Sequence, residues 1–144
     1  MNLHELSLQM AVRDYECDMQ GVVNNAVYQN YLEHARHEFL KVHGIDFAAL
    51  ARAGINLVVV RAELDYRGSL TSGNHFVVRT RMEQLSRLKF AFHQRIVREP
   101  DGKEMISAVI TGTGVNAQGR PFMPPELLPL MAALVDQSLQ QGEA

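Results

Sequence analysis

The residues with the clearest chemical potential lie between positions 14 and 36. An acidic stretch containing Asp18 is followed by Gly21, which makes the turn after it flexible. Asn24 or Asn25 then provides a suitable N-cap for a helix. The first turn of a helix has backbone N–H groups without intrahelical acceptors, and the helix dipole adds partial positive charge there. A carboxylate beside such donors is suited to hydrolysis, because the helix start would stabilise a developing oxyanion.

The helix that positions these groups is expected to end at Gly44, where a left-handed C-terminal residue would stop it. Apolar and aromatic side chains recur at helical spacing on one face: Tyr28, Tyr31, Leu32, Ala35, Phe39 and Val42. Polar side chains occupy the other face: Gln29, Glu33, Arg36, His37 and Lys41. We therefore expect one face of this helix to be buried.

The same segment carries a family resemblance. The pattern Asp18-x-x-Gly21-x-Val23-Asn24-x-x-x-Tyr28-x-x-Tyr31-x-Glu33-x-Ala35-Arg36 resembles the signature of hotdog-fold acyl thioesterases of the 4-hydroxybenzoyl-CoA thioesterase type. The variant Gly21-Val22-Val23-Asn24-Asn25-Ala26-Val27-Tyr28, followed by Arg36-His37-Glu38, is closest to the branch that includes plant acyl-ACP thioesterases. The match is specific over residues 13 to 40 and is looser but continuous to about Glu126.

This resemblance implies a fold, a reaction and an assembly. The fold would be α+β, the hotdog fold, in which a curved antiparallel β-sheet wraps around one long α-helix. The substrate would be an acyl-CoA or acyl-carrier-protein thioester, hydrolysed without metal or redox cofactor. The resemblance further implies a homodimer or a homotetramer built as a dimer of dimers.

The resemblance also implies roles for three residues. Asp18 would either attack the thioester carbonyl or orient water, and the sequence leaves both mechanisms open. The backbone N–H of Asn25 would donate to the oxyanion. Glu33 is a second candidate base, because some hotdog thioesterases use a helix carboxylate. Structural alternatives compete with these roles, since Asp18 could cap a turn and Glu33 could pair with His37 at i,i+4.

We assign substrate binding to residues of the acidic loop, the helix start and a basic pair further along the chain: Tyr15, Gly21, Val22, Asn24, Tyr28, Arg87 and Lys89. Tyr15 and Tyr28 are candidates for the acyl pocket, although aromatic residues at such spacing are more often in the core. Arg87 and Lys89 are candidates for contacts with the phosphates of coenzyme A or phosphopantetheine. Their alternative role is that of solvated strand charges.

Composition restricts the classes of protein that remain. With 144 residues, 47% of them hydrophobic and 21% charged, the sequence predicts a single globular domain over residues 1–144. The formal net charge of -2 gives no general attraction for nucleic acid or for an anionic membrane surface. A single cysteine excludes an intrachain disulfide. The chain lacks an apolar run of about 18 residues and a signal-like N-terminus, so a cytoplasmic location is expected.

Other chemistries are less favoured by the spacing of their candidate residues. His34, His37 and His43 do not form a His-Glu-x-x-His pattern and lack a clear third ligand, so no metal site is expected. Cys17 has no assignable His and acid partners for a nucleophilic role. Two alternatives to hydrolysis stay open: a non-hydrolysing acyl-thioester binding module, and a dehydratase or hydratase on the same fold. The second would need an Asp and a His on the acyl chain, and the sequence offers no clear His for that role.

The rest of the chain predicts strands around the long helix. Strands are expected near residues 3–13, 58–67, 76–83, 90–98 and 105–115, a helical turn near 45–51, and a final helix from 124 that contains Leu127, Leu128, Met131, Leu134 and Val135. In the strand near 58–67, Val58, Val60, Ala62, Leu64 and Tyr66 are expected to share one face and make the strand half-buried. This order of elements predicts an antiparallel sheet packed on the long helix.

Overall fold

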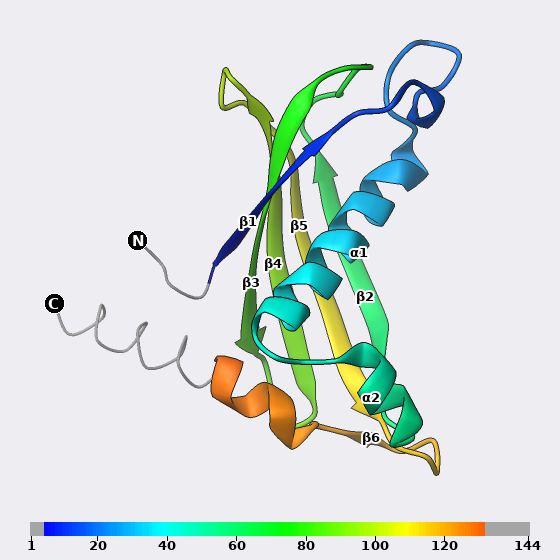
Figure 1. Cartoon of the computed structure of the whole chain (residues 1–144), viewed down its shortest axis with the longest axis vertical. Helices are drawn as coiled ribbons and strands as arrows, with labels where there is room; N and C mark the ends of the chain where they lie inside the picture. Colours follow the sequence, from blue (N-terminus) through cyan, green and yellow to red (C-terminus); the bar gives the residue numbers. More distant parts are fainter. Residues whose placement is uncertain (1–4, 132–144) are drawn as a thin grey trace, which may run out of the picture.

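The computed structural model describes residues 5–131. The elements are β1 (Leu6–Ala11), η1 (Asp14–Glu16), α1 (Asn25–Val42), α2 (Phe47–Arg52), β2 (Asn56–Tyr66), β3 (His75–Gln84), β4 (Lys89–Glu99), β5 (Glu104–Val115), β6 (Pro121–Phe122) and η2 (Pro125–Leu127). In this part of the chain the strands form one six-stranded antiparallel sheet in the order β1-β3-β4-β5-β2, and β6 pairs with β5. Helix α1 lies across one face of the curved sheet (Figure 1). The predicted α+β architecture is confirmed.

Helix α1 begins and ends where the sequence predicts. Asn24 is the N-cap, and its side chain accepts a hydrogen bond from the Ala26 amide at 3.0 Å. Beyond the last helical residue, Gly44 has a φ of 84°, a left-handed conformation that favours glycine. The buried face consists of Tyr28, Tyr31, Leu32, Ala35, Phe39 and Leu40.

The predicted burial of Val42 is wrong, because this side chain is 65% exposed. Ile45 is buried instead, and its amide donates to the Leu40 carbonyl at 2.9 Å. The chain that returns after Gly44 therefore closes the core at this end of α1, and the last helical residue lies outside it.

Strands β3 and β4 present alternate side chains to α1, as predicted. The buried residues on this face are Phe76, Val78, Thr80 and Met82 of β3 and Phe90, Phe92, Gln94 and Ile96 of β4. Thr80 and Gln94 are the polar members of this set. Their hydrogen bonds are part of the candidate site.

Strand β2 differs from its predicted pattern. The pairing register with β5 shifts between Val59 and Arg61, so Val60 is a bulge. Before the bulge Leu57 and Val59 face the helix side, and after it Ala62, Leu64 and Tyr66 do, as their partners on β5 show. The prediction that Val58 and Val60 share a face with Ala62 is therefore wrong. The strand is also mostly exposed rather than half-buried, because β2 is an edge of the sheet.

The described residues include the beginning of the predicted C-terminal helix. The 3₁₀ turn η2 follows Pro124, and Leu127 and Met131 are buried. Leu134 and Val135 lie outside the described residues. Within residues 5–131, no helix combines the length and apolar character needed to cross a membrane.

Candidate active site

Asp18 lies in a tight turn between the 3₁₀ turn η1 and helix α1. Cys17 and Val23 form an isolated β-bridge that closes this turn, and the Asp18 amide donates to the Val22 carbonyl at 2.8 Å. Oδ1 of Asp18 accepts from the amides of Gln20 at 2.8 Å and Val22 at 3.4 Å. Oδ2 accepts no hydrogen bond from the described residues. One carboxylate oxygen therefore fixes the side chain, and the other is available to water or to a ligand.

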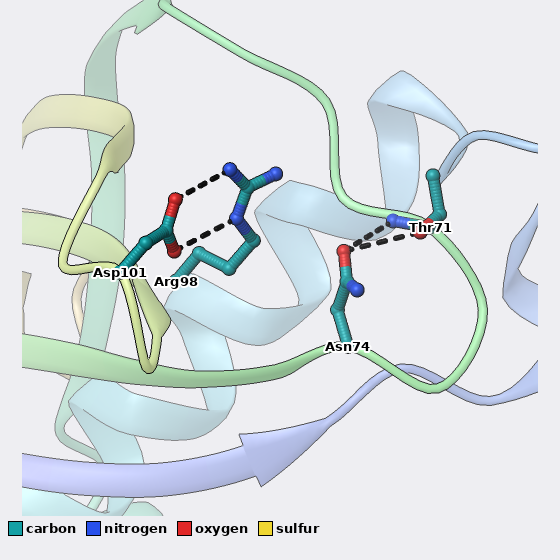
Figure 2. Close-up of polar contacts among 4 residues, drawn as sticks. All are labelled: Thr71, Asn74, Arg98 and Asp101. Atoms are coloured by element: carbon teal, nitrogen blue, oxygen red, sulfur yellow. Dashed lines mark hydrogen bonds and ion pairs between the residues drawn. The ribbon is translucent and has the colours of Figure 1, made fainter.

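The loop before β3 holds this turn against the sheet. Val22 bridges to Thr71, and the Val23 amide donates to the Leu70 carbonyl at 2.9 Å. Asn74 Oδ1 accepts from the Thr71 amide at 2.8 Å and from its hydroxyl at 3.2 Å (Figure 2). The loop is thus ordered by its own side chains and presents a backbone edge to the Asp18 turn.

A second turn lies at the same end of the sheet. Arg98 donates to both carboxylate oxygens of Asp101 across the β4–β5 turn, at 3.0 and 2.6 Å (Figure 2). These hydrogen bonds lower the pKa of Asp101. Because His75 pairs with Glu99, this turn lies beside the start of β3. Its polar groups are satisfied within the turn, so we assign it a structural role.

The start of α1 offers a free backbone donor. The Ala26 amide is bound by the Asn24 side chain, and the Val27 amide donates to the Asn24 carbonyl at 2.9 Å. Among the described residues, the Asn25 amide has no acceptor. This is the amide that the resemblance implies for the oxyanion, and the helix dipole adds partial positive charge at the same place. The geometry is suited to an anionic oxygen. Asn24 precedes this amide as the N-cap, and Gly21 and Val22 lie in the Asp18 turn.

A buried carboxylate that the sequence analysis did not single out lies two residues before Asp18. Glu16 is 9% exposed, and its Oε1 accepts from the Tyr31 hydroxyl at 2.8 Å and from the Arg13 amide at 2.7 Å. Burial and the hydrogen bond to Glu16 raise the pKa of Tyr31 well above its usual value. The sequence carries no capping signal that could have revealed Glu16, because Arg13 at the N-cap position is not one of the residues that cap a helix.

Tyr28 and Tyr66 also lie at the start of α1. Tyr28 is buried, and its hydroxyl accepts from the Leu70 amide at 2.8 Å. The Tyr66 ring packs edge-on against Tyr28 at 5.8 Å, and its hydroxyl is 3.5 Å from the Asn25 carbonyl. Tyr66 is half exposed and forms part of the wall of the site. The sequence pattern predicted only that Tyr66 lies in a strand. Tyr28 thus lies in the core, which was the alternative to its predicted place in the acyl pocket.

A groove runs along α1 beside the edge strand. We define the α1–β2 groove by residues that line one or both of two adjacent cavities: Gln29, Glu33, Arg36, His37 and Leu40 of α1, Phe47 of α2, and Val59, Phe90, Phe92, Ile110 and Gly112 of the sheet. Each cavity has a volume of about 200 Å³. The sheet wall is apolar, and the helix wall is charged. Gln29 is four residues after Asn25, so the groove starts about 6 Å from the helix N-terminus.

Polar groups on the helix wall of the groove form two contacts. Glu33 Oε1 is 3.8 Å from His37 Nε2. Arg36 donates to Gln94 Oε1 at 3.1 Å. Burial lowers the pKa of the Arg36 guanidinium, and the nearby Glu33 carboxylate partly opposes this effect. Glu33 lies about 12 Å along the helix from Asn25, so within one chain the two candidate carboxylates do not share a site.

Tyr15 lies in η1, three residues before Asp18, and its side chain is 78% exposed. The other predicted binding residues, Arg87 and Lys89, are not brought to the Asp18 turn within one chain. Arg87 and Lys89 lie in and after the β3–β4 turn, whereas the start of β3 adjoins the Asp18 end of the sheet. The ten residues of β3 separate the two ends by about 30 Å. In the part of the chain that the structure describes, no group of three or more metal-ligating side chains occurs.

Comparisons with known proteins agree with this architecture. Residues 12–134 match the Thioesterase-like superfamily. The chain is 38% identical over 122 residues to acyl-acyl carrier protein thioesterase ATL2 of Arabidopsis thaliana, covering 85% of this chain and 64% of that protein. It is 30% identical over 106 residues to the long-chain acyl-CoA thioesterase FadM of Escherichia coli, covering 74% of this chain and 80% of that protein. The chain thus spans slightly less than two thirds of the plant relative.

A solved structure supports the fold. The crystal structure of Slr0204, a 1,4-dihydroxy-2-naphthoyl-CoA thioesterase from Synechocystis, matches with a TM-score of 0.85 at 16% identity, covering 90% of this chain and 97% of that one. The predicted hotdog fold is confirmed by this likeness. With the match over residues 12–134, the chain belongs to the Thioesterase-like superfamily of hotdog proteins.

Proposed function

We propose that this protein is a thioesterase that hydrolyses an acyl-CoA or acyl-carrier-protein thioester, with Asp18 as nucleophile or general base. The observation that supports this most directly is the pairing of a fixed carboxylate with a free helix amide. Asp18 is held through Oδ1 alone, and the Asn25 amide has no acceptor among the described residues. A thioester carbonyl placed at the helix start would be polarised by Asn25 N–H while Oδ2 attacks it or takes a proton from water.

The acyl group occupies the α1–β2 groove in this proposal. The groove starts near the proposed oxyanion site, and its sheet wall is built from Phe90, Phe92 and Ile110. Burial of an apolar chain against such a wall is favourable at about 25 cal/mol per Å². This placement makes Glu33 a groove residue rather than the first base. The names of the plant and bacterial relatives, which specify acyl-carrier-protein and long-chain acyl-CoA thioesters, support an aliphatic acyl substrate.

The active assembly is a dimer formed through β2, with a tetramer as its extension. Val58, Val59 and Val60 are 38%, 54% and 50% exposed on this edge strand. An edge strand with unpaired backbone groups and exposed apolar side chains is a template for pairing with another strand. Such a dimer would place a second chain beside the α1–β2 groove, and Arg87 and Lys89 could then serve a site that two chains build together.

The experiment that tests this function is thiol release from a panel of acyl thioesters, each on coenzyme A and on acyl carrier protein. Asp18→Asn keeps the size of the side chain but removes the carboxylate, so kcat should fall by about 100- to 10,000-fold. The matched control is Asp46→Asn at the N-cap of α2, since Asn caps a helix as well as Asp does. Equal activity of the wild type and Asp18→Asn on a hydrolysed substrate would exclude Asp18.

One observation favours a second candidate function. Glu33 and His37 form a carboxylate and imidazole pair that lines the groove, with Glu in place of the Asp expected for a dehydratase or hydratase. Addition of water across an acyl C=C bond would leave the thioester intact. Product analysis separates the two functions, because only hydrolysis releases free thiol.

A further inference from the structure

Glu16 contacts both sides of the turn that carries Asp18. Its side chain reaches back to the end of β1 through the Arg13 amide and across to α1 through the Tyr31 hydroxyl. Its backbone carbonyl accepts from the Asn24 amide at 3.0 Å. Asn24 is the residue that caps α1 directly before Asn25.

These bonds fix the relative position of the two proposed reacting groups. Asp18 follows Glu16 by two residues. Cys17, which lies between them, pairs with Val23 across the turn, so the position of Glu16 determines the position of the turn. Asn25 follows Asn24, whose amide is bound to Glu16. A shift of Glu16 would therefore move Asp18 and the Asn25 amide relative to each other.

The carboxylate is too buried and too well bonded to take part in the chemistry itself. Oε1 accepts two hydrogen bonds, and Oε2 is 3.9 Å from Arg13 Nη1. Glu16 is 9% exposed, whereas Asp18 is exposed. A buried carboxylate that loses its partners is strongly unfavourable, so this cluster has one preferred geometry.

We propose that Glu16 is a positioning residue: with Tyr31 it holds the Asp18 carboxylate in register with the free amide at the start of α1. This proposal rests on the proposed hydrolytic function. Misplacement of a reacting group by about 1 Å can cost on the order of 100-fold in rate. The effect should lie in kcat, because the α1–β2 groove does not include Glu16.

The test compares Glu16→Ala, Glu16→Gln and Tyr31→Phe in the hydrolysis assay. Glu16→Ala should lower kcat by about 10- to 100-fold with little change in KM. Glu16→Gln should restore most of the rate, because its amide oxygen can accept from both Arg13 N–H and the Tyr31 hydroxyl. Tyr31→Phe removes one bond and should give a smaller loss of kcat than Glu16→Ala. If Glu16→Ala does not fold, the kcat values of Glu16→Gln and Tyr31→Phe are compared with that of the wild type instead.

The control is a core variant at the opposite end of the sheet from the turn, Leu127→Val or Leu127→Ala in η2, chosen to match the urea midpoint of the Glu16 variant. Its kcat should equal that of the wild type. Loss of kcat in Glu16→Gln as large as in Glu16→Ala would overturn the proposal, since the charge itself would then be needed. Unchanged kcat in both Glu16→Ala and Tyr31→Phe, while Asp18→Asn is inactive, would also overturn it and leave the proposed function intact. Full activity of Asp18→Asn would instead overturn the function.

Discussion

Gln94 shows how single residues join the sheet to the helix wall of the groove. Its Nε2 donates to the Leu32 carbonyl and to Thr80 Oγ1, both at 3.0 Å, and its Oε1 accepts from Arg36. The side chain is 1% exposed, so each of these groups would be hard to satisfy otherwise. The Arg36 guanidinium is thereby held at the groove although no carboxylate lies within ion-pair distance among the described residues.

Gln94→Leu should therefore destabilise the protein, although it replaces a buried polar side chain with an apolar one. The apolar side chain leaves the Arg36 guanidinium and Thr80 Oγ1 without this partner, at a cost of about 1–3 kcal/mol in the free energy of unfolding for each such group. Urea denaturation measures this loss. Gln118→Leu in the exposed turn after β5 is the control and should change stability by less than about 0.5 kcal/mol. Equal stability of Gln94→Leu and the wild type would mean that this network is not required.

Gly112 sets the depth of the groove. A Cβ at this position would lie 2.7 Å from the Phe90 ring and 2.8 Å from the Val58 carbonyl. Gly112→Ala should push the ring into the groove and cost about 1–3 kcal/mol of stability. If the acyl chain lies there, kcat/KM should fall more for long acyl chains than for short ones. A uniform fall across chain lengths, measured on a homologous series of thioesters, would place the chain elsewhere.

At the scale of elements, β2 combines a bulge with an exposed edge. The bulge at Val60 turns Leu57 and Val59 toward the groove and leaves Val58 on the opposite side from them. The same strand thus supplies a wall of the acyl groove and the edge on which a second chain would pair. If the proposed dimer and the proposed acyl site are both correct, assembly and substrate binding are coupled through this strand.

The double variant Val58→Lys and Val60→Lys should weaken assembly. Lysine on an edge strand opposes pairing with another edge because two like charges and their hydration would be brought together. Light scattering after size-exclusion chromatography should show the wild type as a dimer or tetramer and the variant shifted toward monomer. A matched change at Ala117→Lys, in the exposed turn before β6, should leave the assembly unchanged. A variant that keeps the wild-type mass would exclude β2 as the interface.

The sequence predicted those elements whose signals are local. The cap at Asn24, the stop at Gly44 and the alternation of β3 and β4 each depend on neighbouring residues, and each is confirmed. The bulge was missed because three consecutive valines give the same pattern in either register. The Arg36–Gln94 contact joins residues 58 positions apart, so no local pattern could reveal it. Glu16 was overlooked because its partner Tyr31 was read only as a core residue.

At the scale of the whole molecule, two buried tyrosines make the stability of the core depend on pH. Burial raises the pKa of Tyr28, partly offset by the hydrogen bond from Leu70, and burial with the Glu16 contact raises that of Tyr31 further. The unfolded chain ionises these phenols near pH 10, whereas the folded chain keeps them neutral. Their contribution to stability is therefore complete below about pH 10 and decreases as the pH rises above it.

The free energy of unfolding should accordingly decrease between pH 9 and 11, and it should decrease less in Tyr31→Phe, which has no phenol to ionise. Urea unfolding at a series of pH values measures both slopes. The comparison concerns slopes, because Tyr31→Phe also loses its bond to Glu16 and is expected to be less stable at every pH. Identical slopes for the two proteins would show that Tyr31 does not link the core to alkaline pH.

The most direct test of the whole account is the kcat for thiol release by the wild type and by Asp18→Asn, measured on the best acyl thioester of the panel. The account predicts hydrolysis by the wild type and a loss of about 100- to 10,000-fold in the variant, with an unchanged circular dichroism spectrum and oligomeric mass. Wild-type activity retained by a folded Asp18→Asn variant would contradict it and direct attention to Glu33→Gln in the groove.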